Sequence, residues 1–394
     1  MESLKSTLLR IWLIARREQR FFARRPLLLF SMIIVPVTAL VLFTTVMAKG
    51  LPTDLPAGLV DEDNTQVSRS ISRTLDAMGA TNLVHRYPTF HEARQAMQRG
   101  EIYAFFHIPK GTTRAALSQR KPTIAFYTNE SYFLPGSLLM KDMRLASELL
   151  GMSVTRSTLT AKGATASQAL STVQPVVLES HPLGNPWINY GICLTNILVP
   201  GLFILTILLS TSYTIGMEWK ADTQRDLLRM AGGNPAIALT GKLLPQTLLY
   251  ILLFVFLDVY LYRYMAFPCH CGIGNMILLG CLTVLASQGM AIFIFAIFPG
   301  MMRFAMSICS LIGVVELSAA GYTYPVTAMD EWLQWVVNVL PLRHYYLIYV
   351  NQALNGYDIT YVWPYVTALV LMALLPVLVM WSYKWIFENA RYRA

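Results

Sequence analysis

The stretch Leu27–Met47, LLLFSMIIVPVTALVLFTTVM, carries no charged residue over 21 consecutive positions. A helix needs about 20 predominantly apolar residues to cross a bilayer core of about 30 Å, so this stretch can form one membrane span. It is longer than the apolar region of a cleavable signal peptide, which has about 7 to 15 residues, and no small-residue cleavage site follows it cleanly. We therefore expect a helix that stays in the membrane.

Five further stretches have the length of a membrane span, which gives six spans in total. Only 13% of the chain is charged, whereas an ordinary soluble domain has about 25%. This composition excludes a soluble globule and a disordered chain, and it predicts an α-helical polytopic membrane protein with six transmembrane helices. The five stretches are Trp187–Met217, Leu243–Tyr264, Gly272–Met302, Phe304–Tyr324 and Tyr361–Tyr383.

The net charge of +9 is distributed unevenly along the chain. The segments 1–26 and 218–242, Arg303 and the residues after the last span hold 15 of the 31 basic residues but only six of the 22 acidic ones, so they account for the whole excess. Short cytoplasmic segments are enriched in Lys and Arg. The charge pattern therefore predicts a multi-pass membrane protein with both termini in the cytoplasm, and it gives no support to nucleic-acid binding.

Residues 48–186 separate the first span from the second and are long enough to bury a core of their own. They combine short strand patterns, such as Gly58–Asp61 and Glu101–Ile108, with a helical pattern in Ser68–Met78. Further expected elements are a helix ending at Gly100, a strand in Thr123–Tyr127 and one or two helices in Gly136–Val173. The pattern predicts an extracytoplasmic α+β domain inserted between the first and second spans.

The expected organisation of the chain therefore has four parts. They are a cytoplasmic elbow helix in 1–26, the first transmembrane helix in 27–47, the extracytoplasmic domain in 48–186 and a five-helix transmembrane region in 187–394.

The N-terminal segment has the pattern of a helix that lies in the headgroup layer. Apolar residues including Trp12 recur at helical spacing, and Arg16, Arg17 and Arg20 lie on the opposite flank. Helices of this composition bind membrane surfaces. Two interpretations fit the pattern: an elbow helix that also borders a cytoplasmic partner, or a basic flank that only fixes the topology.

A charged segment, EWKADTQRDLLRM in Glu218–Met230, lies between the second and third spans and is followed by Ala-Gly-Gly-Asn-Pro. As one helix it would carry an acidic stripe beside a basic one, and the Gly-Gly-Asn-Pro sequence would end it. A short charged helix of this kind suits a membrane subunit on which a soluble motor pushes, although a solvated connector has the same composition. The stripes would hold Glu218, Asp222 and Asp226 on one side and Arg225 and Arg229 on the other.

Common catalytic motifs are absent from the sequence. Gly241-Lys242 is followed by Leu243 and lacks the preceding Gly of a P-loop, so the chain has no nucleotide-binding loop of that type. His91-Glu92 does not continue to a second zinc-ligating His, and there is no Gly-x-Ser-x-Gly nucleophile elbow. The chain is therefore predicted to be no enzyme.

The order of these segments resembles the permease subunit of the ABC type-2 transporter family, and the resemblance covers almost the whole chain. The chain departs from the family pattern at Trp219-Lys220-Ala221-Asp222, where the family more often has a basic residue, Glu and a Gly-Thr pair. The motifs that carry the resemblance are Gly58–Asp63 (GLVDED), Gly100–Pro109 (GEIYAFFHIP), Met217–Lys220 (MEWK), Leu227–Met230 (LLRM) and Leu340–Tyr345 (LPLRHY).

The resemblance implies that the segment 218–230 is a coupling helix seated on an ATP-hydrolysing subunit encoded separately, and that the permease works as a dimer with a second copy or a paralogue. No cofactor is expected in this chain, because ATP and Mg would bind the partner ATPase. Membrane lipids surround such a permease, and its outer domain would receive cargo or dock a periplasmic membrane-fusion adaptor. The residues expected to couple to the ATPase are Glu218, Trp219, Asp222, Arg225, Asp226 and Arg229.

The segment 325–355 lies between the fifth and sixth spans and is too short and too polar to cross the membrane twice. Trp332 and Trp335 share an apolar face that ends at Pro341. Interfacial aromatic residues of this kind mark segments that dip into the outer leaflet. The resemblance implies re-entrant helices that close the outer end of the path; a surface helix anchored by its Trp residues is the alternative.

Two acids lie inside predicted spans. An acid at a helix centre costs about 2.5 to 3.5 kcal/mol on insertion scales, so it normally faces a partner, water or a path. Glu316 falls near mid-membrane, and Asp258 lies nearer the outer end of its span, where Arg263, Tyr260 or Tyr262 could satisfy it. Both are candidates for the substrate path, and a buried hydrogen bond that fixes helix packing is the alternative for each.

The tripeptide Cys269-His270-Cys271 precedes the fourth span. Two thiols one residue apart with a single His do not complete the usual four-ligand zinc set, so no metal site is predicted. A bridge between the two cysteines would be strained.

The function predicted from all these features, including the resemblance, is the membrane-spanning permease subunit of an ATP-driven exporter in a bacterial inner membrane, which moves an amphipathic or hydrophobic substrate outward. Two alternatives belong to other classes. An ion-coupled secondary transporter would use Glu316 and Asp258 and would show inverted repeats, of which the sequence gives no sign. A receptor would sense a ligand with its outer domain, but the tail after Tyr383 is short for an output domain.

Overall fold

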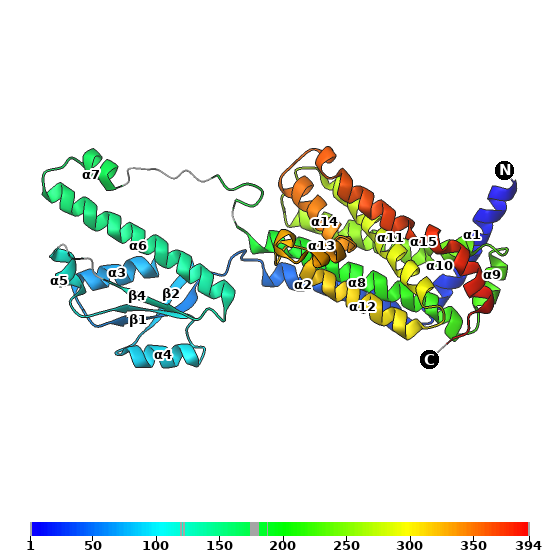
Figure 1. Ribbon diagram of the computed structural model, residues 1–394, viewed down its shortest axis with the longest axis horizontal. Helices are drawn as coiled ribbons and strands as arrows, with labels where there is room; N and C mark the ends of the chain where they lie inside the picture. Colours follow the sequence, from blue (N-terminus) through cyan, green and yellow to red (C-terminus); the bar gives the residue numbers. More distant parts are fainter. Residues whose placement is uncertain (1, 119, 121–122, 174–180, 187, 393–394) are drawn as a thin grey trace. The chain divides into compact units, whose positions relative to one another are not determined.

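The computed structural model describes residues 2–118, 120, 123–173, 181–186 and 188–392 (Figure 1). The chain forms two compact units. The helical unit comprises Met1–Gly50 and Pro182–Ala394, and the sheet unit comprises Leu51–His181.

In the part of the sheet unit that the structure describes, the strands form one four-stranded sheet in the order β2-β1-β3-β4. Strand β1 pairs in parallel with both β2 and β3, whereas β3 and β4 are antiparallel. The strands are β1 (Leu55–Asp61), β2 (Thr81–Arg86), β3 (Ala104–Ile108) and β4 (Ala125–Thr128). The helices are α3 (Gln66–Asp76), α4 (Phe90–Gln98), α5 (Thr112–Leu117), α6 (Phe133–Ala161) and α7 (Ala166–Val173).

The sheet is covered on both faces, because successive side chains of a strand point to opposite sides. Leu59 of β1 and Phe106 of β3 join a core with α3 and α6. Their neighbours Val60 and Phe105 join a smaller core with α4 on the other face. Figure 1 shows α4 across the sheet from α3 and α6.

The structure agrees with most of the elements expected in this unit and adds two. The expected strands in 58–61, 101–108 and 123–127 correspond to β1, β3 and β4, and the expected helices correspond to α3, α4, α6 and α7. Strand β2 and helix α5 were not expected. Strand β2, with the sequence TNLVHR, lies at the edge of the sheet and is partly exposed. It therefore lacks the alternation of apolar and polar residues by which a strand is recognised in a sequence.

The helical unit contains six helices that are long and apolar enough to cross a membrane, counted over the described residues. The predicted six spans are thereby confirmed, although Trp187, the expected start of the second, lies outside the described residues. They are α2 (Pro26–Val46), α8 (Tyr190–Lys220), α10 (Pro235–Val259) continued by the π-helix η1 (Tyr260–Tyr264), α11 (Ile273–Ile297), α12 (Met302–Ala319) and α15 (Trp363–Asn389).

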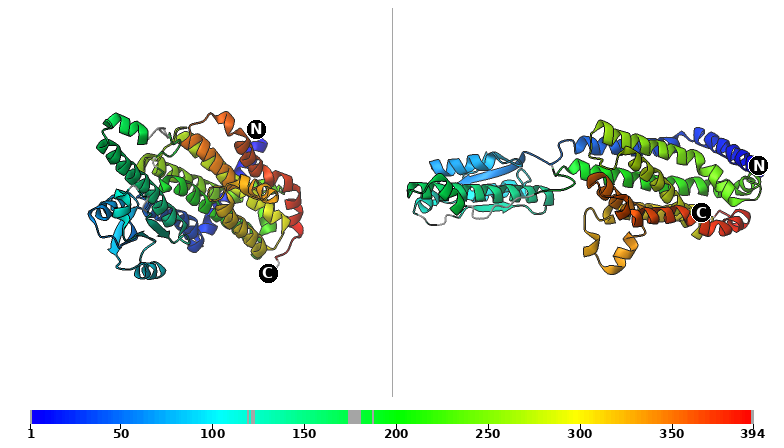
Figure 2. Two further views of the ribbon diagram at one scale, coloured as in Figure 1. Left: turned by 60° about the vertical axis from the view of Figure 1, so that its left-hand side comes forward. Right: turned by 90° about the horizontal axis from the view of Figure 1, so that it is seen from above.

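Seven further helices belong to this unit over the described residues. They are α1 (Glu2–Ala23), α9 (Gln224–Met230), η2 (Val326–Ala328), α13 (Glu331–Val337), α14 (Pro341–Tyr349), η3 (Val350–Leu354) and η4 (Ile359–Tyr361). Helix α1 packs along α10, so the expected elbow helix lies against the bundle. Figures 1 and 2 show α12 alongside α8, which is one of the most extensive helix pairs.

Glycines allow two of the helix pairs to approach closely. A side chain at Gly289 would overlap the backbone of Met372 in α15, and one at Gly313 would come within 2.5 Å of Leu205 in α8. Small residues at such crossings are typical of membrane helix packing, because association there depends on close van der Waals contact.

Candidate functional site

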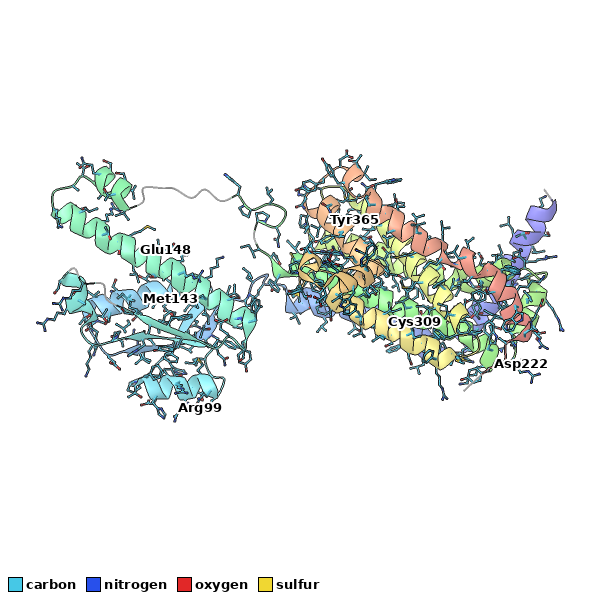
Figure 3. The ribbon with its side chains drawn as sticks, in the orientation of Figure 1. Arg99, Met143, Glu148, Asp222, Cys309 and Tyr365 are labelled. Atoms are coloured by element: carbon cyan, nitrogen blue, oxygen red, sulfur yellow. The ribbon has the colours of Figure 1, made fainter. Side chains whose placement is uncertain are left out.

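The connector between α8 and α10 is not the single helix expected for Glu218–Met230. Helix α8 continues to Lys220, the chain turns at Asp222, which has a φ of 54°, and α9 then begins at Gln224. A left-handed residue interrupts a right-handed helix, so the expected acidic stripe of Glu218, Asp222 and Asp226 does not exist. Glu218 belongs to the buried end of α8, whereas Asp222 is exposed in the turn, where Figure 3 labels it.

Four charged side chains meet at the base of this connector, and we call them the ionic cluster: Arg17, Glu18, Glu218 and Lys242. The Nζ atom of Lys242 lies 2.9 Å from Oε2 of Glu18 and 2.7 Å from Oε1 of Glu218. The other oxygen of Glu218 accepts a hydrogen bond of 2.9 Å from Nη2 of Arg17. The ionic cluster therefore joins α1, α8 and α10.

Three members of the ionic cluster are shielded from solvent, whereas the side chain of Arg17 is 32% exposed. The side chains of Lys242 and Glu18 are each 1% exposed and that of Glu218 is 5% exposed. Buried charges are costly unless they are paired with good geometry, and here two carboxylates face two cations. Burial raises the pKa of the Glu18 carboxyl, and the charge of Lys242 opposes this shift. Each member is thus held by the others, which fixes the three helices in one arrangement.

Helix α1 also contacts the C-terminal end of the connector. Gly232, just after α9, has a φ of 69°, and a Cβ there would overlap the guanidinium of Arg10. Farther along α1, Ile14 packs so closely on Gly241 of α10 that a Cβ at Gly241 would lie 2.8 Å from it. Helix α1 therefore lies beside the C-terminal end of α9 and the first turns of α10.

Three of the four predicted elbow residues, Trp12, Arg16 and Arg20, lie on the exposed side of α1, so the prediction that Trp12 and the arginines occupy opposite flanks is wrong. Trp12 is 54% exposed, and the guanidinium of Arg16 lies 5.3 Å from its ring centroid. Arg20 is exposed as well. Arg17 differs, because it enters the ionic cluster. The side facing the bundle carries Ile14, Ala15, Glu18 and Phe22, all of them buried.

The residues expected to couple to an ATPase divide into buried and exposed sets. Trp219 is buried, with its ring centroid 5.2 Å from those of Phe295 in α11 and Phe387 in α15. Arg225 is exposed and donates to the carbonyl of Glu388, at 2.9 Å from Nη2. The surface of α9 that is open for a partner holds Asp226 and Arg229, which form an i, i+3 ion pair of 3.3 Å.

Helix α10 continues the ionic cluster as a buried polar stripe. Lys242, Gln246 and Tyr250 follow one another at i, i+4 spacing, so they lie on one face. The Nε2 atom of Gln246 donates to Oγ of Ser210 at 2.9 Å and to Oγ1 of Thr211 at 2.8 Å. The hydroxyl of Tyr250 lies 2.8 Å from that of Ser210. Sequence reasoning missed this polar contact between α8 and α10, although the spacing on α10 would have indicated it.

Glu316 is fully buried and bonds to the segment between the fifth and sixth spans. Its Oε2 atom accepts a hydrogen bond of 3.2 Å from the backbone N–H of Leu342, in the first turn of α14. The first N–H groups of a helix have no partner within the helix, so an acceptor oxygen at its N-terminus satisfies one of them. Among the described residues, its other oxygen has no hydrogen-bond partner.

Asp258 is also buried, but none of its expected partners bonds to it in the described structure. The hydroxyl of Tyr262 donates instead to Oδ1 of Asn196 at 2.9 Å. Tyr260 stacks on Tyr264, and Arg263 is exposed. Within the described residues, Oδ2 of Asp258 has no hydrogen-bond partner.

The segment 325–355 forms η2, α13, α14 and η3, and the expected break at Pro341 falls between α13 and α14, where Pro341 is the first residue of α14. Trp332 and Trp335 of α13 are exposed, the latter by 77%, whereas Pro341 is buried. Nη1 of Arg343 donates to the carbonyl of Ala320 at 3.0 Å, just after α12. The hydrogen bond between Leu342 and Glu316 and the one between Arg343 and Ala320 thus both hold α14 against the C-terminal part of α12.

The two cysteines of Cys269-His270-Cys271 have their sulfur atoms 4.0 Å apart. No group of three or more His, Cys, Asp or Glu residues is arranged to hold a metal ion in the part of the chain that the structure describes.

The profile of one protein family, described as ABC-2 family transporter protein, matches residues 26–382. A comparison with curated proteins found no match. The matched region runs from the first residue of α2 to near the end of α15 and so includes all six membrane-spanning helices and the connector. The chain therefore belongs to the ABC-2 family of transporter proteins.

Proposed function

We propose that this chain is the permease subunit of an ATP-driven exporter, and that a separate ATPase docks on the exposed face of α9. Membership of the ABC-2 family supports a membrane transporter subunit, and the membrane domain of that family is no nucleotide-binding domain. The exposed charges of Asp226 and Arg229 on a short helix between two spans suit an interface with a soluble protein.

The observation that carries the proposal is the ionic cluster. A push on α9 acts on the end of α8 through the turn at Asp222, and Glu218 at that end is bonded to Lys242 of α10 and Arg17 of α1. The three helices would therefore move as one body. ATP binding can drive such a movement only if the ATPase contacts the two permease states differently, and the exposed surface of α9 offers that contact.

In this proposal α9 and both termini face the cytoplasm of a bacterium, and the sheet unit faces outward. The basic residues near α1, α9 and the C-terminus support that orientation. A second permease chain would complete the path, and the sheet unit would receive cargo or dock a periplasmic adaptor. ATP and Mg would bind the ATPase partner.

The outer end of the path would be closed by α13 and α14 in the described state. Glu316 and Arg343 bond this segment to α12, so opening would break or stretch both contacts. The exposed Trp332 and Trp335 would anchor the segment at the membrane interface. An amphipathic or hydrophobic substrate would then leave outward past this segment, and Asp258 is a second candidate for a polar contact along that route.

Copurification tests the proposal through a charge reversal on α9. Asp226→Arg changes a side chain that is 66% exposed, so the fold should be kept while the docking surface changes sign. Arg303→Glu, at the exposed start of α12, is the matched control. A P-loop ATPase identified by mass spectrometry should copurify with the wild type and with Arg303→Glu but not with Asp226→Arg. Equal recovery of the ATPase with all three, or with none, would contradict the proposal.

A further inference from the structure

The loop between η1 and α11 holds Cys269 and Cys271 in a defined geometry. The backbone N–H of His270, between them, donates to the carbonyl of Ala353 at 3.0 Å. The side-chain amide of Asn275 donates to the carbonyl of Cys271 at 3.0 Å. The loop is therefore bonded on one side to η3 and on the other to the first turn of α11.

Both thiols are partly exposed, and their sulfur atoms lie 4.0 Å apart. This separation allows a hydrogen bond between the thiols. With Cys269 as the donor, that bond lowers the pKa of the Cys271 thiol below its usual value and raises the pKa of Cys269 above its usual value. The thiolate is the nucleophilic form of cysteine, so the pair contains one reactive sulfur and a second sulfur within reach of it.

Cys271 also borders a cavity of about 190 Å³ between the start of α11, the α14–η3 segment and the start of α15. Its lining is mostly apolar and includes Met276, Leu279, Ile348 and Val362. A reactant that approaches Cys271 therefore finds open space beside the sulfur.

We propose that Cys269 and Cys271 form a thiol–disulfide exchange site, with Cys271 as the attacking residue and Cys269 as the resolving one. This goes beyond the exporter function and rests on the proposed topology only for the compartment, which would be the oxidising exterior where disulfides persist. The reactant is a disulfide of another molecule, either a small disulfide that joins two thiol molecules or a protein disulfide.

The exchange has two balanced steps. The Cys271 thiolate attacks one sulfur of the external disulfide, the external S–S bond breaks, and one external thiolate leaves. Cys269 then loses its proton and attacks Sγ of Cys271, which releases the second external thiolate. The two protein sulfurs are oxidised to one disulfide, and the external disulfide is reduced to two thiols. A bridge between residues only two apart closes a small strained ring, so it is readily reduced again.

Mass spectrometry of the purified full chain tests the site. The tryptic fragment from Tyr264 to Arg303 contains Cys269, Cys271 and Cys281, so Cys281→Ala is the background that leaves two thiols in the fragment. After treatment with oxidised glutathione, this fragment should be lighter by two hydrogen atoms, and dithiothreitol should restore it. Adding Cys269→Ser should instead leave glutathione bound to Cys271, because the resolving sulfur is gone.

Three results would overturn the proposal. In the first, iodoacetamide would still alkylate both cysteines fully after treatment with oxidised glutathione. The Cys281→Ala protein could accumulate the same glutathione adduct as the Cys269→Ser protein, which would mean that Cys269 does not resolve it. In the third, both thiols would be protected from alkylation, and a metal chelator would remove that protection. The pair would then be assigned to a metal instead. ATP and the ATPase are absent from this assay, so its failure would leave the exporter proposal standing.

Discussion

The Nζ atom of Lys242 in α10 lies 2.7 Å from Oε1 of Glu218 in α8, and both side chains are buried. Lys242 also bonds to Glu18 of α1, so one ammonium group links three helices at the base of α9. The ionic cluster is therefore one structural connection between the connector that carries α9 and the membrane-spanning helices.

Replacing Lys242 should destabilise the helical unit strongly. Lys242→Met leaves Glu18 and Glu218 buried with Arg17 as their remaining cation in the cluster, and breaking a buried pair costs about 3 to 5 kcal/mol. Thermal unfolding in detergent should show a clear loss relative to Lys220→Met, which removes an exposed lysine at the end of α8. Adding Glu18→Gln to Lys242→Met should restore part of the loss. If the two lysine variants unfold at the same temperature, the cluster does not hold the helices.

The contact between Arg10 and Gly232 can be isolated by comparing two neighbouring glycines. Gly232 and Gly233 both have positive φ, so alanine at either position is strained by about 1 to 2 kcal/mol. A Cβ at Gly233 would meet open space, whereas one at Gly232 would meet Arg10. Gly232→Ala should therefore cost more stability than Gly233→Ala, and the excess should disappear in an Arg10→Ala background. An excess that persists without Arg10 would argue against this contact.

Glu316 should stabilise the helical unit by accepting a hydrogen bond from the backbone at the start of α14. Glu316→Gln keeps an acceptor for the N–H of Leu342, whereas Glu316→Leu leaves that buried N–H unpaired at a cost of about 1 to 3 kcal/mol. The wild type and Glu316→Gln should unfold at similar temperatures, and Glu316→Leu should unfold at a lower temperature. Equal stability of the Gln and Leu variants would remove the assigned role of Glu316 in holding α14.

The sheet unit should lose stability in acid through Asp63. Hydrogen bonds from the side chain and backbone of Thr113 and from the backbone of Gly111 lower the pKa of Asp63. A carboxyl whose pKa is lowered by folding contributes stability above its unfolded pKa of about 3.9, and this is lost as the pH falls through the folded value. Below pH of about 4, the unfolding temperature of the wild type should therefore fall more steeply than that of Asp63→Asn. Parallel pH profiles would contradict this assignment.

The sequence was sufficient for the large elements of the fold. Uncharged runs such as Leu27–Met47 predict membrane helices because length and apolarity are local properties, and the structure places α2 there. Strand β2 was missed because an edge strand with polar, exposed residues has no strong local pattern. The break before α9 was missed because it depends on the positive φ of Asp222, which helical spacing alone does not reveal.

The ionic cluster was only partly predictable. Glu218 was recognised as a charged residue of the connector, but its burial depends on Lys242, 24 residues away, and on Arg17, 201 residues away. Lys242 was considered only in the charge count of the segment 218–242 and in the failed P-loop match. A signal for Glu18 was present, since it falls between Ala15 and Phe22 on the apolar side of α1, where an acid needs a buried partner. The identity of that partner required the tertiary structure.

Photocross-linking from α9 tests the central claim most directly. A photoreactive residue at Arg229, which is 80% exposed on α9, should cross-link in native membranes to a polypeptide that mass spectrometry identifies as a P-loop ATPase. The same residue at Arg99, exposed in the sheet unit, should give no such product. An ATPase adduct from Arg229 alone is the result that the account predicts. The absence of an ATPase adduct from Arg229, or an equal adduct from Arg99, would contradict it.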